Sequence, residues 1–188
     1  MKRLALLAIP LVLAACGGSP ATKADTPGTT AAPKACPPAG GGTGPAGSAV
    51  KPGQTMLLTA VKVDSDACSD RVVFDFRRAG GAEPGYTVSY RPAAEAQTED
   101  ASGRHIPIAG KAFLVVRFEP AATADLSGAK LEKTYTGPRT IKPVGMRWVQ
   151  QISKTGDFEA VLTWAIGLTE RRAFKLTSSA SRLEIELR

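Results

Sequence analysis

The sequence predicts an all-β domain, an antiparallel two-sheet sandwich, and two observations support this fold class. Apolar and polar residues alternate with a period of two in several short segments, as where Val72, Phe74 and Phe76 are separated by polar or smaller residues. Turn-forming pairs such as Gly80-Gly81 and Gly137-Pro138 separate these segments. No long stretch shows convincing helical periodicity. Short alternating strands between turns are typical of a sandwich in which each sheet buries one face.

The expected strands follow one another from residue 56 to the C-terminus. They are segments 56–63, 72–77, 86–91, 112–118, 147–154, 160–166, 172–177 and 183–188. Segments 112–118 and 160–166 are apolar on both faces over much of their length, which suits central strands. Thr155-Gly156-Asp157 stands between two strand-like runs and predicts the tip of a hairpin.

The first sixteen residues predict a lipoprotein leader. Lys2 and Arg3 precede an apolar run, residues 4–15, that is too short to cross a membrane as an ordinary helix. The run ends in Leu-Ala-Ala-Cys, the form of a bacterial lipobox, in which the cysteine thiol receives diacylglycerol. We therefore expect residues 1–15 to be a signal peptide and Cys16 to be the lipidated N-terminus of a protein on the outer face of the cell membrane. The alternative is an ordinary signal peptide with a chance cysteine.

Residues 16–50 are expected to comprise the lipidated cysteine and a disordered tether. They consist almost entirely of Gly, Ala, Pro, Ser and Thr, and Val50 is the only sizeable aliphatic residue. Such a segment buries too little apolar surface to offset its chain entropy. As a flexible coil it would hold the domain roughly 30 Å from the bilayer. The folded domain is then expected to span residues 51–188.

Two cysteines remain once Cys16 carries lipid. In an oxidising compartment, Cys36 and Cys68 favour a disulfide that pins the end of the tether to the domain. The alternative is two free thiols, because Cys36 lies in a segment with no reason of its own to be ordered. The pair is not a CxxC motif, so no thiol enzyme is indicated.

The charge of the chain is moderately basic. Its formal net charge of +7 falls to +5 when Lys2 and Arg3 leave with the signal peptide. In a cytoplasmic protein this surplus would suggest nucleic acid as a partner. Outside the membrane the available anions are lipid headgroups, wall polymers and the carboxylates of peptidoglycan, so no nucleic-acid partner is expected. A solvated surface with a mild surplus is the alternative to an electrostatic role in binding.

The sequence contains no recognisable catalytic or metal-binding motif. His105, the single histidine, stands in a loop, and the adjacent carboxylates Glu99 and Asp100 lie in a Gly/Ser-flanked loop typical of solvated residues. There is no GxSxG, SxxK, P-loop or GxGxxG motif and no zinc-ligand spacing. We expect no enzyme activity, no bound metal and no cofactor.

Tyr135 and Arg139 are the candidate ligand-binding residues. They flank Thr136-Gly137-Pro138, a turn on which an aromatic ring could stack on a sugar while the guanidinium pairs with a carboxylate. The alternative is that Tyr135 covers the end of the sandwich and bonds its hydroxyl to the backbone. Trp164 lies in an apolar segment and is expected to pack in the core.

Four segments in a fixed order carry a resemblance to a known family. They read DRVVFDF (70–76), PGYTV (84–88), YTGPR (135–139) and GDFEAVLTWAIGL (156–168). The order resembles the AMIN-like domain of actinobacterial lipoproteins and secreted proteins, over about residues 57–188. The resemblance implies a β-sandwich and a non-enzymatic module. AMIN domains proper are associated with peptidoglycan binding and with localising amidases and secretins in the envelope.

The expected function is therefore that of a membrane-anchored surface lipoprotein that binds peptidoglycan or an anionic wall polymer and catalyses no reaction. Two alternatives remain. One is a carrier of hydrophobic molecules in a cavity between the sheets, which a closed, packed core would exclude. The other is a protein-binding accessory subunit of an envelope complex that uses an edge strand.

Overall fold

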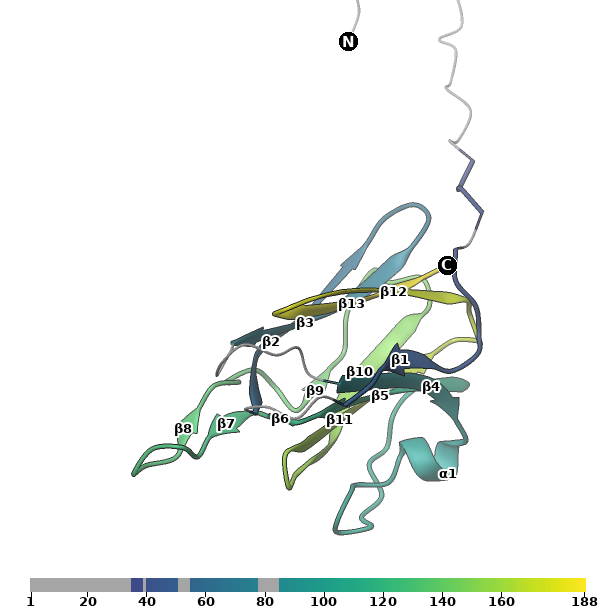
Figure 1. The fold of residues 1–188 in the computed structure, drawn as a ribbon. Helices are drawn as coiled ribbons and strands as arrows, with labels where there is room; N and C mark the ends of the chain where they lie inside the picture. The colour runs from purple at the N-terminus through teal and green to yellow at the C-terminus, as the bar shows by residue number, and fades with distance from the viewer. Residues whose placement is uncertain (1–34, 39, 51–54, 78–84) are drawn as a thin grey trace, which may run out of the picture. The chain divides into compact units, whose positions relative to one another are not determined.

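The computed structural model describes residues 35–38, 40–50, 55–77 and 85–188 (Figure 1). The predicted signal peptide and the proposed lipidation site Cys16 lie outside these residues. Residues Ala35–Arg188 form one compact unit. Within the described ranges no helix is long and apolar enough to cross a membrane.

Two sheets pack face to face, which confirms the predicted sandwich (Figure 1). The six-stranded sheet contains, in spatial order, β1 (Ala46–Ser48), β4 (Gly85–Arg91), β5 (Ala112–Glu119), β11 (Val161–Leu168), β10 (Val149–Phe158) and β9 (Thr140–Ile141). The five-stranded sheet contains β12 (Phe174–Ser179), β13 (Arg182–Leu187), β3 (Asp70–Arg77), β2 (Met56–Ser65) and β6 (Ala121–Ala122). Strand β6 pairs with β2 in parallel, and the other ladders are antiparallel.

All eight predicted segments form strands, within a few residues of the expected bounds. The short elements were not predicted. They are β1, β6, β9, the one-turn helix α1 (Ala93–Ala96), and a ribbon of β7 (Ala124–Asp125) and β8 (Glu132–Lys133). Two- or three-residue strands carry no readable alternation, so only their tertiary partners define them.

The inner faces of the two sheets meet in a packed aromatic and aliphatic core. Trp164 and Phe118 from the six-stranded sheet and Phe74 from the five-stranded sheet are fully buried. The ring of Phe74 lies edge-on to both, with centroids 5.1 Å from Phe118 and 6.0 Å from Trp164. Such pairs add about 0.5–1.5 kcal/mol each beyond the burial of their area. This packing fills the interior that the carrier alternative needs as a cavity.

The segment from residue 35 to residue 50 belongs to the folded unit, which corrects the C-terminal part of the predicted tether. We call it the strap. It is cross-linked by the Cys36–Cys68 disulfide, with the two Cα atoms 5.3 Å apart, as the leftover cysteines predicted. Gly42 then exchanges backbone hydrogen bonds of 3.2 and 2.8 Å with Phe174 at the start of β12. Beyond it, β1 pairs with β4.

The composition of the strap suggested disorder because it offers little apolar surface to bury. The structure holds it by other means, a covalent cross-link and backbone hydrogen bonds. Its glycines permit this close contact, since a Cβ atom at Gly47 would collide with the carbonyl oxygen of Tyr86. The glycines in this low-complexity segment therefore allow the strap backbone to lie close against the neighbouring strands.

The tip of the β10–β11 hairpin is Glu159-Ala160, not the predicted Thr155-Gly156-Asp157. Strand β10 continues to Phe158, which pairs with Val161, and the two residues between them have φ of +50° and +58°. Two positive φ angles are the mark of a type I′ hairpin turn, which usually recruits Asn and Gly. Gly156 instead lies in an irregular step of the β10–β11 ladder, where a side chain would collide with Asp100.

Candidate functional site

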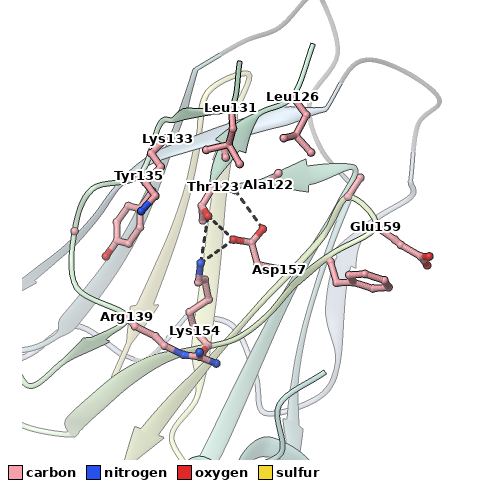
Figure 2. Close-up of a pocket in the computed structure, with 14 residues that line it drawn as sticks. Ala122, Thr123, Leu126, Leu131, Lys133, Tyr135, Arg139, Lys154, Asp157 and Glu159 are labelled. Atoms are coloured by element: carbon pink, nitrogen blue, oxygen red, sulfur yellow. Dashed lines mark hydrogen bonds and ion pairs between the residues drawn. The ribbon is translucent and has the colours of Figure 1, made fainter. Parts of the chain in front are cut away.

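A groove of about 440 Å³ opens at the end of the sandwich formed by the β10–β11 tip (Figure 2). The β7–β8 ribbon lies on one side and the hairpin tip on the other. Its lining includes Thr123, Leu126, Leu131, Lys133, Tyr135, Arg139, Lys154, Asp157, Phe158 and Glu159. The volume falls within the roughly 300–1,000 Å³ typical of small-molecule pockets.

Large apolar side chains stand exposed around this groove. Leu126, Leu131 and Phe158 are 73, 60 and 58% exposed, and they are three of the five large hydrophobic residues exposed in the described part of the chain. All three line the groove. Scattered exposed apolar residues are ordinary, but a group gathered around one concavity marks a surface that contacts something else.

The polar floor of the groove is a fixed arrangement of three side chains (Figure 2). Asp157 accepts hydrogen bonds from the backbone N–H of Thr123 at 3.3 Å and from its hydroxyl. Lys154 donates to the same carboxylate at 2.7 Å and to the Thr123 hydroxyl at 3.2 Å. The charges of Asp157 and Lys154 neutralise each other, and both side chains are bonded to Thr123, so the floor is polar, cross-linked by hydrogen bonds and without a net charge.

Both predicted ligand-binding residues line the groove, but Tyr135 is not the exposed stacking platform that was proposed. It is 9% exposed, and its ring lies edge-on to Trp164 with centroids 5.5 Å apart. Its hydroxyl donates to the carbonyl of Pro138 at 2.9 Å. Burial raises the pKa of Tyr135. Tyr135 therefore covers the end of the core, which is the alternative considered from the sequence.

Arg139 lies at the rim of the groove and is held there by the backbone and by Glu99. Its Nε donates to the carbonyl of Lys154 at 3.2 Å, and its guanidinium pairs with the Glu99 carboxylate. Arg104 pairs with the same carboxylate at 3.0 Å. The Ser102 hydroxyl, Arg139 and Arg104 together hold the pKa of Glu99 at about 2. Arg139 is thus a positioned, half-exposed cation.

The adjacent carboxylates Glu99 and Asp100 do not form an acid–base pair. Glu99 faces the arginines, whereas Asp100 accepts a hydrogen bond from the Thr163 hydroxyl at 2.7 Å on the outer face of the six-stranded sheet. His105 takes part in an isolated bridge with Thr98. Among the residues that the structure describes, no group of three or more His, Cys, Asp and Glu side chains is placed to hold a metal ion.

Sequence reasoning missed the three apolar residues of the groove. Leu126 and Leu131 flank the turn-rich stretch Ser-Gly-Ala-Lys, and Phe158 directly precedes the hairpin tip. Leu126 and Leu131 beside a run of turn residues have no long strand whose inner face could bury them, and this was the available signal for those two; Phe158 at the end of β10 gave none.

One protein-family model covers most of the sandwich, including the segment GDFEAVLTWAIGL that contains the hairpin tip. The family model of the AMIN-like domain matches residues 56–188. The chain belongs to the AMIN-like domain family. No curated protein and no solved structure matches the chain. The AMIN-like region contains every residue of the groove, whereas the strap lies before it.

Proposed function

We propose that this chain is a lipid-anchored surface protein whose AMIN-like domain binds peptidoglycan or an anionic wall polymer in the groove and catalyses no reaction. The observation that carries the proposal is the gathering of Leu126, Leu131 and Phe158 around a concave site with cations at its rim. The family supports it, because AMIN-like domains are generally binding modules rather than enzymes.

The chemistry of the groove suits a wall saccharide that carries carboxylates or phosphates. The exposed ring of Phe158 offers an apolar face to the C–H face of a sugar. Lys133 supplies positive charge at the rim, and the half-exposed Arg139, although it pairs with Glu99, keeps one terminal nitrogen that donates to neither Glu99 nor Lys154 and can donate to a ligand carboxylate. The fixed Asp157–Lys154 floor offers hydrogen-bonding groups that need no rearrangement when a ligand binds.

The position of the groove also suits a tethered protein. The strap joins the domain at the loop between β2 and β3, through Cys68. The groove lies at the other end of these strands, where Thr134 donates to the Leu58 carbonyl at 2.8 Å and Arg77 pairs with Asp125 of the β7–β8 ribbon at 3.3 Å. Figure 1 shows the ribbon and the C-terminus at opposite ends of the sandwich. The cross-link to the strap and the groove therefore lie at opposite ends of β2 and β3.

The test is sedimentation of the full-length protein with purified sacculi. Replacing Phe158→Ser and Leu131→Ser removes exposed apolar surface that the fold does not use, so we expect wall binding to fall about tenfold without a change in thermal stability. Val144→Ser is the matched control, because Val144 is 96% exposed and lies outside the groove. If the protein does not sediment with sacculi even at low salt, wall binding is wrong and a protein partner becomes the better occupant of the groove.

Membrane anchoring is tested separately. Labelled fatty acid should be incorporated by the wild-type protein and not by Cys16→Ser, and the variant should leave the membrane fraction. Equal labelling of both proteins would contradict the assignment of Cys16.

A further inference from the structure

A second cluster of exposed groups lies at the end of the sandwich that carries the strap. We call it the basic patch. It consists of Arg147, Trp148, Arg171 and Arg172, together with the exposed Val144 from the loop before β10. Two loops form it, one before β10 and one after β11, and the N–H of Thr169 joins them by donating to the Trp148 carbonyl at 2.9 Å. The strap reaches the same place, because Arg171 donates to the carbonyl of Thr43 at 2.9 Å.

The guanidinium groups of the basic patch lie over aromatic rings. Arg172 lies 4.4 Å from the centroid of the Trp148 ring, and Arg147 lies 5.8 Å from the same centroid. Arg171 lies 4.6 Å from the centroid of the Tyr90 ring. A cation–π contact uses the face of the guanidinium, so the N–H groups, which lie in the guanidinium plane, stay available to an oxyanion.

Four carboxylate side chains near this end are already paired with arginines. Asp64 and Asp66 both pair with Arg71, at 2.7 and 2.8 Å. Glu186 pairs with Arg188 at 2.6 Å, and Glu170 pairs with Arg172 at 3.1 Å.

Asp70 is fully buried and is used by backbone N–H groups. In the described part of the chain, Arg147 and Arg171 have no carboxylate within ion-pair distance. Their positive charge is therefore available to an external anion.

The basic patch also exposes apolar groups between its cations. Val144 is 96% exposed and lies between Lys142 and Arg147 in the sequence, and the Trp148 ring is half-buried. An aliphatic side chain and an amphipathic indole flanked by cations is the combination found where proteins contact the headgroup region of a bilayer. A soluble polyanion would need the cations but would gain nothing from Val144.

We propose that the basic patch docks the domain on an anionic phospholipid bilayer, with Arg147 and Arg171 against headgroup phosphates and Val144 and Trp148 at the interface. The proposal rests on the membrane anchoring put forward above. Two observations favour a bilayer as the partner of the patch. The cations complement anionic headgroups, and the strap that contacts the patch through Thr43 follows the proposed lipidation site Cys16 in the sequence. Docking would orient the domain with its groove outward, which a lipid on Cys16 alone does not achieve.

The first experiment measures where Trp148 lies. The chain has two tryptophans, and Trp164 is fully buried, so quenching by lipid-borne bromine reports on Trp148. Protein that begins at residue 17, which carries neither the apolar leader nor lipid and keeps the whole compact unit from Ala35, is mixed with phosphatidylcholine vesicles with or without phosphatidylglycerol. We expect tighter binding to the anionic vesicles and quenching of Trp148 by brominated lipid. Binding without quenching, or equal binding to both vesicles, would overturn the proposal.

The second experiment uses charge-matched variants of the same protein. Arg147→Gln with Arg171→Gln should weaken binding to anionic vesicles by about tenfold or more, because each cation near the surface contributes to adsorption. Arg117→Gln with Lys130→Gln removes the same charge from other exposed surfaces and should weaken it by less than about threefold. Equal losses would mean that net charge alone drives binding and would contradict a docking surface.

Wall binding separates this inference from the proposed function. The Arg147→Gln, Arg171→Gln double variant should sediment with sacculi as the wild type does. The Phe158→Ser variant should bind vesicles as the wild type does. If the arginine double variant loses wall binding but not vesicle binding, then Arg147 and Arg171 recognise the phosphates of a wall polymer, and bilayer docking is wrong. A fatty-acid labelling result against Cys16 would leave the vesicle measurements valid, because they use protein without lipid.

Discussion

The two ends of the sandwich share one core but hold their exposed groups in different ways. At the groove end, Leu126 and Leu131 project from a ribbon whose strands are two residues long. At the strap end, the exposed cations lie over aromatic rings, and the backbone is fixed by the Cys36–Cys68 disulfide and by buried Asp70. The strap end therefore combines a firmly held backbone with a charged surface. The groove end instead exposes apolar side chains that do not contribute to the core.

The largest effect is expected at Asp70. Its carboxylate accepts hydrogen bonds from the backbone N–H groups of Arg147, Trp148 and Val149, at 3.1, 2.7 and 3.0 Å. Burial alone would raise the pKa of Asp70, but these donors outweigh burial and lower it. Asp70→Ala leaves three N–H groups without an acceptor, so we expect urea unfolding to show a loss of about 3–5 kcal/mol.

Asp125→Ala is the matched variant at the groove end. Its carboxylate accepts from the exposed Ser127 and pairs with Arg77, so its removal should cost less than about 1 kcal/mol. Equal losses in the two variants would contradict the contrast between the ends.

The disulfide should come next. In the chain-entropy model, closing a loop with a sequence separation of 32 residues contributes about 3–4 kcal/mol. We expect Cys36→Ser with Cys68→Ser to lower the free energy of unfolding by this amount and to speed amide exchange in β1, which pairs with β4. Exchange at the β10–β11 tip should not change. A faster exchange at both ends would show that the strap supports the whole sandwich rather than its own end.

A smaller effect is expected from Asp157, for a reason other than the predicted turn. Its carboxylate ties Thr123 to Lys154 across the groove floor, so Asp157→Ala leaves the Lys154 ammonium partly buried without its anion. We expect a loss of about 1–2 kcal/mol and weaker sedimentation with sacculi. Glu159→Ala is the control. Glu159 is exposed at the tip, and its backbone has a positive φ, which is no more costly for alanine than for glutamate. A neutral result for Asp157→Ala would mean that the floor is not held by this carboxylate.

The smallest effect is the pH dependence at Glu99. Its pKa of about 2 in the folded protein lies below the ordinary value of 4.5, so its stabilisation is present above about pH 4.5 and is lost as the pH falls through 2. The stability difference between wild type and Glu99→Gln should therefore be greatest near neutral pH and vanish near pH 2. A difference that persists at pH 2 in thermal melts would show that the charge of Glu99 is not what matters.

The strands could be predicted because packing leaves a regular trace in the sequence. In β3 every second side chain is buried, so the alternation of Val72, Phe74 and Phe76 is a direct record of the core. The strap leaves no such trace, since it is held by backbone hydrogen bonds and one cross-link. Composition alone therefore favoured disorder.

The groove could be located only in part, because its residues come together through the fold. Tyr135 and Arg139, singled out from the sequence as candidate binding residues on a turn, both line it. Their roles depend on partners far away in the sequence, Trp164 against the Tyr135 ring and Glu99 against the guanidinium. Neither contact follows from the local pattern of a turn.

The pairing of β1 with β4 has a further consequence for self-association. Residues 46–48 occupy the outer edge of β4 by pairing with Val88, Thr87 and Tyr86. A bare edge of this length is a template for strands of neighbouring copies. By covering it with a short, glycine-containing strand of its own, the chain limits edge-to-edge aggregation, and the three-residue β1 offers little to a further strand. The strap thus protects the six-stranded sheet from copies of the same protein.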